Sequence, residues 1–332
     1  MKGRALTMNP IRSRKNKQEM LMRLGTVILR TVLLVGFSYI ILYPVILMFS
    51  KAFMAQKDVF DNSVLWIPRH FTLDNIKVAA TTMKYGESLM NSVGYALLGT
   101  VLQMIPCLMA GYAFARYDFK GKGLLFAVVV LTIIVPPQQF MTPLYLHLSQ
   151  FDIFGIIKAV NGGKALNLTA TQFPYFLLSL TGFGLRNGLF IFLFRQSFRG
   201  VPRETEEAAM VDGANSFRIF WQIMLPGTIT VLVTVMLFSF VWQYNDTYYS
   251  SLLLNNVRTL PQAYELFDSA ITGWKGDLSV SNMLSQYVLD DPKVLSLLRN
   301  SAMILIMAPL LGVYAVAQRY FIQSIERSGI VG

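Results

Sequence analysis

Long apolar stretches without Asp, Glu, Lys or Arg dominate the pattern of hydrophobic and polar positions along this chain. Each of five stretches is long enough to cross a bilayer, because a helix rises about 1.5 Å per residue and the hydrocarbon core is about 30 Å thick. They cover residues 31–50, 88–115, 123–151, 219–245 and 300–318. A sixth stretch, residues 173–194, is equally apolar but contains Arg186. The pattern predicts six transmembrane helices and an all-α integral membrane fold.

A pair of adjacent prolines and a group of glycines predict interruptions in two of the six helices. Prolines occupy positions 136–137 in the third stretch, and proline removes a backbone hydrogen bond. Gly182, Gly184 and Gly188 surround Arg186 in the fourth stretch. We expect a broken helix at the prolines and a loosened helix around Arg186. No strands are expected, because the apolar positions do not alternate as they do in a membrane strand.

Charged residues set the orientation of the predicted helices. The basic N-terminal region precedes the first helix, and positive charge marks the cytoplasmic side of a membrane protein. The short connections 116–122 and 195–203 are also basic, whereas acidic residues outnumber basic ones in the long connection 246–293. Both termini are therefore expected in the cytoplasm. The net charge of +11 follows mostly from this topology, so no nucleic-acid partner is expected.

The topology divides the chain into five regions. They are a basic cytoplasmic tail (1–24), the first transmembrane helix (25–50), an irregular extracytoplasmic loop (51–87), a core with five transmembrane helices (88–320) and a cytoplasmic tail (321–332). Within the core, the outer connection at residues 152–172 is either a flexible loop or a shallow helix.

The cytoplasmic connection at residues 201–226 has the pattern of two short helices. Pro202 suits the start of the first helix, acidic residues follow at the positive end of the helix dipole, and Gly213 permits a left-handed conformation that ends it. We expect Ser216 to cap a second, amphipathic helix and Pro226 to bend the chain toward the fifth span. The first helix should lie at an angle to the membrane, where another protein can bind it.

This connection resembles the EAA loop of the permease subunits of bacterial ABC importers, which has the spacing E-A-A-x3-G-x9-I-x-L-P. Further stretches are similar to the carbohydrate-uptake branch of these permeases, the MalG-like maltose permeases. They are NSVGYALLGT, AGYAFARYDFKGKG, FLFRQSFRGVPRETEEAA and QRYFIQ. The resemblance covers roughly residues 88–322.

The resemblance implies a type I importer fold in the bacterial inner membrane, with the segment 201–226 as the element that couples transport to an ATPase. The coupling residues implied by the motif are Glu207, Ala208, Ala209, Asp212, Gly213, Ile223, Leu225 and Pro226. It also implies three partners, which are a homologous permease subunit, an ABC ATPase dimer and an extracytoplasmic sugar-binding protein. The imported solute would be a sugar or oligosaccharide.

Other functions fit the residues less well. The chain has no G-x-x-x-x-G-K-[ST] motif, so ATP must be bound by a partner subunit and no cofactor is expected here. A secondary transporter usually carries Asp or Glu within a span, and the six stretches contain neither. The two histidines, His70 and His147, form no catalytic or metal-binding motif, which argues against a membrane enzyme. An ABC importer permease for a non-sugar solute stays open as an alternative.

Two groups of residues are candidates for the substrate pathway. Arg186, followed by Asn187, should lie about 13 Å from the cytoplasmic edge, where a charge costs about 2.5–3.5 kcal/mol unless it faces a cavity or a partner. The alternative is a structural arginine that binds helix-end carbonyls or the partner permease. The second group, at the outer end of the fifth span, suits the ring faces and hydroxyls of a sugar but also fits an interfacial aromatic belt. It comprises Trp242, Tyr244, Asn245 and Asp246.

Overall fold

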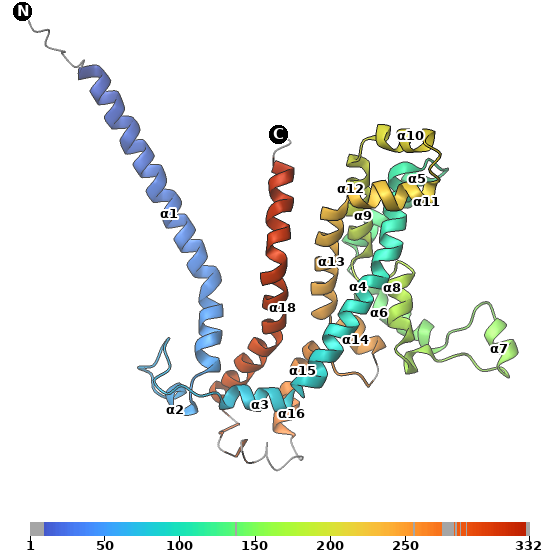
Figure 1. Cartoon of the computed structure of the whole chain (residues 1–332). Helices are drawn as coiled ribbons and strands as arrows, with labels where there is room; N and C mark the ends of the chain where they lie inside the picture. Colours follow the sequence, from blue (N-terminus) through green and yellow to red (C-terminus); the bar gives the residue numbers. More distant parts are fainter. Residues whose placement is uncertain are drawn as a thin grey trace, which may run out of the picture.

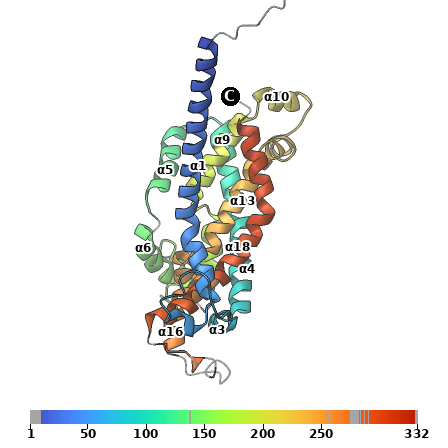
Figure 2. The same ribbon diagram turned by 90° about the vertical axis from the view of Figure 1, so that its left-hand side faces the viewer.

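The computed structural model describes residues 10–136, 138–254, 256–273, 282, 284–285, 287–289 and 291–329. Within these residues the chain is helical, and its only strand-like pairings are the isolated bridges Met54 to Phe71 and Phe151 to Leu166. Figures 1 and 2 show the long helices running between two ends of the molecule. One end carries α3 and α16, and the other carries α10. The predicted all-α fold is confirmed.

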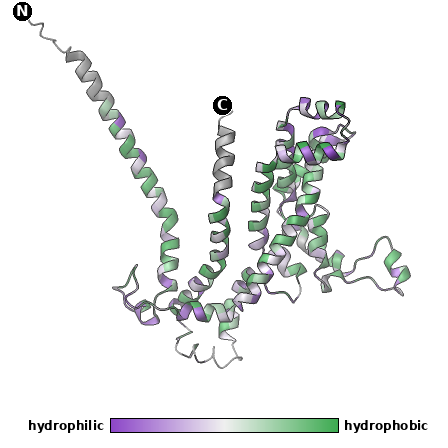
Figure 3. Cartoon of the chain, in the orientation of Figure 1, coloured by the Kyte–Doolittle hydropathy of each residue, from purple (hydrophilic) through white to green (hydrophobic). Residues whose placement is uncertain are grey.

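Among the residues that the structure describes, three helices are long and apolar enough to cross a membrane individually. They are α1 (Pro10–Ala52), α4 (Tyr85–Arg116) and α18 (Pro292–Gly329), with spanning parts Met22–Ala52, Tyr85–Arg116 and Pro292–Gln318. Figure 3 shows that hydrophobic residues dominate the coloured parts of these helices. Helix α1 already begins at Pro10, so it includes much of the predicted tail at residues 1–24. The boundaries of the five regions stay a prediction.

The predicted third and fourth spans are each divided into two helices. The third consists of α5 (Lys122–Ile134) and α6 (Gln138–Ser149), and the fourth of α8 (Phe173–Leu180) and α9 (Asn187–Gly200). The helix break expected near the prolines is confirmed, although Pro137 itself lies outside the described residues. The break in the fourth span covers residues 181–186, where Gly182 and Arg186 have positive φ values of 84° and 62°. A residue with positive φ cannot continue a right-handed helix.

The predicted fifth span begins with a sharp bend. Helix α11 (Ser216–Ile219), a π-helical turn (Phe220–Met224) and α12 (Leu225–Gly227) run at 78° to α13 (Ile229–Tyr244). The bend falls at Thr228 rather than at Pro226, because Pro226 lies in the first turn of α12, where proline loses no hydrogen bond. The pair is long and apolar enough to count as one bent span.

The connections at the end opposite α10 contain short helices. They are α2 (Gln56–Val59), α3 (Asp74–Thr82), α7 (Ile156–Val160), the 3-10 turn η1 (Leu168–Ala170), α14 (Tyr248–Leu253), α15 (Leu260–Glu265) and α16 (Phe267–Thr272). The loop predicted to be irregular at residues 51–87 is therefore helical over α3. Buried Asn75 orients this helix by donating to the carbonyl oxygens of Ala52 and Met54, at 3.1 and 2.8 Å. A side chain that bridges residues this far apart in sequence gives no local pattern.

Helix α4 lies at the centre of the packed part of the chain, against α8, α9 and α13. Phe190, Phe194 and Phe198 recur every four residues on α9 and are fully buried against it. A Cβ atom on Gly111 of α4 would lie 2.5 Å from the Cβ of Phe194, so the two backbones approach closely only because this position is glycine. This tight α4–α9 contact fixes the break at residues 181–186 relative to α4.

Candidate functional site

The segment with the EAA spacing forms α10 (Arg203–Val211), which lies at the same end of the molecule as the start of α1 and the end of α18 (Figure 1). Pro202 is the N-cap rather than the first helical residue. Gly213 has φ 82°, as the prediction of a left-handed end requires. Asn215, not Ser216, caps α11, because its side-chain oxygen accepts the backbone N–H of Arg218 at 2.8 Å. Both residues are good N-caps, so sequence alone did not separate them.

A buried ion pair ties α10 to the end of α4. The Arg116 Nε and Glu206 Oε2 atoms lie 3.3 Å apart, and their side chains are only 7% and 10% exposed. Arg116 also donates to the carbonyl oxygen of Val201 at 2.6 Å, and the Tyr112 hydroxyl donates to Glu206 at 3.4 Å. Sequence reasoning chose the neighbouring Glu207 and missed this pair. Glu206 and Ala209 are three residues apart and share the buried face of α10. This spacing was the sequence signal that Glu206, rather than Glu207, faces the protein interior.

The residues assigned to coupling divide between two faces. Glu207, Ala208, Asp212, Gly213 and Pro226 are exposed, Ile223 and Leu225 are half-buried, and Ala209 is buried. Large apolar side chains are exposed beside them. Exposed apolar patches on soluble surfaces usually mark a site that binds a partner. They are Met210, Val211, Phe217 and Trp221. The exposed residues leave a surface of small, acidic and apolar groups at one end of the molecule.

The break at residues 181–186 brings two candidate pathway residues together. Arg186 caps α9 in a left-handed conformation, and its Cζ atom lies 5.5 Å from the centroid of the Trp242 ring on α13. This distance is within the range of a cation–π contact. Arg186 is exposed, whereas the adjacent Asn187 is buried.

A network of buried amides and hydroxyls surrounds this break and was missed by sequence reasoning. At its centre, Gln103 of α4 donates to the carbonyl oxygen of Leu185 at 2.5 Å and to the side chain of Asn187. The side-chain oxygen of Gln103, Oε1, accepts from the side chains of Ser239 and Gln243 on α13, at 2.7 and 2.9 Å. Tyr175 of α8 donates to Gln243 at 3.1 Å. The network therefore joins α4, α8, α9 and α13 through polar groups that are nearly all satisfied, as buried polar groups must be.

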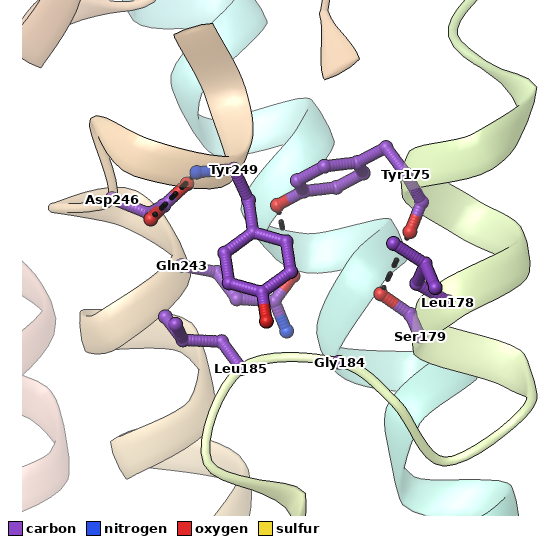
Figure 4. Close-up of a pocket in the computed structure, with 8 residues that line it drawn as sticks. All are labelled: Tyr175, Leu178, Ser179, Gly184, Leu185, Gln243, Asp246 and Tyr249. Atoms are coloured by element: carbon purple, nitrogen blue, oxygen red, sulfur yellow. Dashed lines mark hydrogen bonds between the residues drawn. The ribbon is translucent and has the colours of Figure 1, made fainter. Parts of the chain in front are cut away.

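A small cavity of about 10 Å³ borders the network and has space for roughly one water molecule (Figure 4). Its lining includes Tyr175, Gln243, Asp246 and Tyr249. Asp246 is buried there and accepts the backbone N–H groups of Tyr249 and Ser250 at 3.3 and 2.8 Å. Burial raises the pKa of the Asp246 carboxyl, and these backbone donors offset part of the effect. Its oxygens are thus turned toward the start of α14.

The remaining two pathway candidates lie elsewhere. Tyr244 is buried in the core between α13 and α18, where its hydroxyl donates to the carbonyl oxygen of Ile306 at 3.0 Å. Asn245 is exposed and donates to the carbonyl oxygen of Val241 at 2.9 Å. Packing accounts for the position of Tyr244, and a pathway role for either residue stays a prediction.

Comparison with known proteins gives the family. The profile described as "Binding-protein-dependent transport system inner membrane component" matches residues 104–327, which is most of the chain and includes α9, α10 and α13. The chain belongs to this family. It is a transport family of the inner membrane, and the expectation from the EAA spacing is confirmed at this level.

Individual relatives of this permease transport sugars according to their names. The chain is 28% identical over 246 residues to the probable starch degradation products transport system permease AmyC of Thermoanaerobacterium thermosulfurigenes, covering 74% of this chain and 82% of AmyC. It is 26% identical over 313 residues to the arabinooligosaccharides permease AraQ of Halalkalibacterium halodurans, covering 92% of this chain and 98% of AraQ. The alpha-glucoside permease AglG of Rhizobium meliloti is 36% identical over 180 residues. That alignment covers 54% of this chain and only 44% of AglG.

The fold of the permease is also found in a solved structure. A bacterial ABC transporter involved in the import of the acidic polysaccharide alginate aligns with a TM-score of 0.64, covering 89% of this chain and 96% of the matched chain. The two sequences are 22% identical, so this likeness establishes the shared fold. The fold is that of an ABC importer permease.

Proposed function

We propose that this chain is the transmembrane permease subunit of an ATP-driven importer of a sugar or oligosaccharide. The relatives named for alpha-glucosides, starch degradation products and arabinooligosaccharides support the sugar class. In this proposal the chain lies in the bacterial inner membrane with both termini in the cytoplasm. It works with a homologous permease subunit, an ATPase dimer that binds the ATP, and an extracytoplasmic sugar-binding protein.

The exposed surface of α10 and α11 is the observation that carries this proposal. Met210 and Val211 are 57% and 88% exposed. They lie on the short helix α10, at the end of the molecule where α1 starts and α18 ends (Figure 1). Exposed apolar side chains beside the acidic Glu207 and Asp212 suit a protein partner at the cytoplasmic side. We infer that the ATPase dimer binds this surface.

The buried pair between Glu206 and Arg116 supplies a mechanical link in this proposal. A force on α10 acts on the end of α4 through the ion pair and through the hydrogen bond from Arg116 to Val201. Helix α4 packs against α8, α9 and α13, which surround the break at Arg186. Closure of the ATPase dimer on ATP would thereby alter access to the pathway from the two sides of the membrane.

Uptake in a reconstituted system tests the proposed function. The importer is assembled in liposomes with its partner subunits, with ATP and radiolabelled oligosaccharides supplied on opposite sides. Import should persist when a protonophore collapses the proton gradient and should stop when the ATPase loses its phosphate-binding lysine. Import that survives the ATPase substitution but stops with the protonophore would show a proton-coupled transporter instead.

A further inference from the structure

The guanidinium of Arg186 is an exposed positive charge at the break in the fourth predicted span. Among the residues that the structure describes, no carboxylate forms an ion pair with it. The acidic residue at the outer end of α13, Asp246, is buried and directs its oxygens to backbone N–H groups of α14. Because charges inside membrane proteins are normally paired or face water, the guanidinium of Arg186 faces water or a partner from outside this chain.

The position of Arg186 is fixed from both sides. Gln103 holds the preceding carbonyl, that of Leu185, and also the side chain of the following residue, Asn187. Gly188 packs so closely on α5 that a Cβ atom there would lie 2.7 Å from the carbonyl oxygen of Val129. The backbone at Arg186 therefore cannot shift along the helix axis without breaking these contacts, so the charge stays at the break.

The surroundings of this charge include an aromatic surface. The following residue, Asn187, is buried and is enclosed by protein rather than open to a ligand. Trp242, which Arg186 approaches, stacks on Phe190 and Phe238 with ring centroids 5.6 and 5.8 Å away. A sugar ring has apolar faces that pack on aromatic rings, and a carboxylate accepts from a guanidinium such as that of Arg186.

We propose that Arg186, with Trp242 beside it, binds the carboxylate of an acidic sugar, so that the imported solute is a uronate-containing oligosaccharide. This inference rests on the proposed function, because it requires that the break lines the substrate pathway. A guanidinium binds a carboxylate through two parallel charge-assisted hydrogen bonds, whereas a neutral sugar offers only hydroxyl groups.

Binding of oligosaccharides to the assembled complex tests this substrate class directly. The sugar-binding protein is left out, so its own specificity does not affect the result. The permease pair and ATPase dimer are placed in nanodiscs of phosphatidylcholine, which carries no net charge. Binding of radiolabelled trigalacturonate and trimannuronate is then compared with binding of their methyl esters, which have the same rings without the charge. We expect the wild-type complex to bind at least one acid about tenfold or more tightly than its ester, in line with charge-assisted hydrogen bonds.

Variants of two arginines on the same segment separate recognition from general charge. Arg186→Gln should remove the difference between acid and ester, and Arg186→Lys should restore little of it, because lysine lacks the planar pair of donors. Arg199→Gln, at the exposed cytoplasmic end of α9, should keep the wild-type preference. Each variant is quantified per assembled complex.

Several results would overturn the inference. They are equal binding of acid and ester by the wild type, no binding of either acid, or a preference that persists in Arg186→Gln. A lower recovery of complex together with a persisting preference would mean that Arg186 pairs with a carboxylate of another subunit. Failure of the proposed function would be seen separately, as a wild-type chain that does not assemble with the ATPase.

Discussion

Replacing Glu206 by alanine should destabilise the protein strongly, although Glu206 lies next to the exposed Glu207. The change removes one partner of a buried ion pair and leaves the charge of Arg116, which is 7% exposed, in an apolar cluster. Breaking such a pair costs about 3–5 kcal/mol. Arg116 keeps its hydrogen bond to the carbonyl of Val201, so we expect the lower end, about 3 kcal/mol.

The single cysteine provides the assay for this prediction. Cys107 is fully buried in the same cluster as Ala209 and Met224, so a fluorogenic maleimide reacts with it only when this region unfolds. In an importer assembled with cysteine-free partners, the unfolding midpoint of Glu206→Ala should fall by roughly 6–12 °C, since a domain of this size loses about 2–4 °C per kcal/mol.

Glu204→Ala is the matched control, because Glu204 is an exposed glutamate in the first turn of the same helix. Its effect should stay within about 0.5 kcal/mol, as for other surface substitutions. A midpoint for Glu206→Ala no lower than that of Glu204→Ala would refute the reasoning, because the ion pair would then contribute nothing to the connection between α10 and α4.

Three further predictions follow from two glycines and from a buried carboxylate in the segment 51–87. Gly213→Val places a branched residue at φ 82°, at a cost of about 1–2 kcal/mol, and should lower co-purification with the ATPase while membrane levels stay normal. Gly99→Ala should destabilise the chain, since its Cβ would overlap a side-chain oxygen of the buried network, whereas Gly94→Ala on the same helix meets nothing within 4 Å and should not destabilise it. Burial would raise the pKa of Asp58, but hydrogen bonds from the ring and backbone N–H of His70 outweigh it and hold that pKa below its ordinary value. The stability that these bonds confer should be complete above about pH 5 and be lost as the pH falls below about 4. Unfolding followed by intrinsic fluorescence measures this loss, which should be absent in Asp58→Asn.

Sequence alone predicted the features that local residue chemistry determines. Apolar stretches predicted the helices, prolines and glycines predicted both breaks, and the left-handed residue after α10 was assigned to Gly213. A fixed motif spacing was enough to indicate the family, which the profile match confirmed. These features depend on neighbours a few residues apart, so they are readable from one sequence.

The polar network and the ion pair were not predicted, because they join residues far apart in the sequence. Gln103 contacts residues 84 and 140 positions away, and Glu206 contacts a tyrosine 94 positions away. A polar residue within an apolar stretch gives no sign of its partner until the helices pack. The same limit applies to the burial of Tyr244 beside α18, which no neighbouring residue in the sequence indicates.

Cross-linking of the α10 surface to the ATPase tests the central claim most directly. Val211→Cys, introduced with Cys107→Ser, places a thiol at a position that is 88% exposed, at the end of the molecule that carries α10. Phe154→Cys, at a position 99% exposed near α7 at the other end, is the control (Figure 1). A bifunctional maleimide should join Val211→Cys to a cysteine placed on the surface of the ATPase that faces the permease, and should not join Phe154→Cys. Absence of any cross-link from Val211→Cys in an assembled, active importer would contradict the assignment of α10 as the coupling helix.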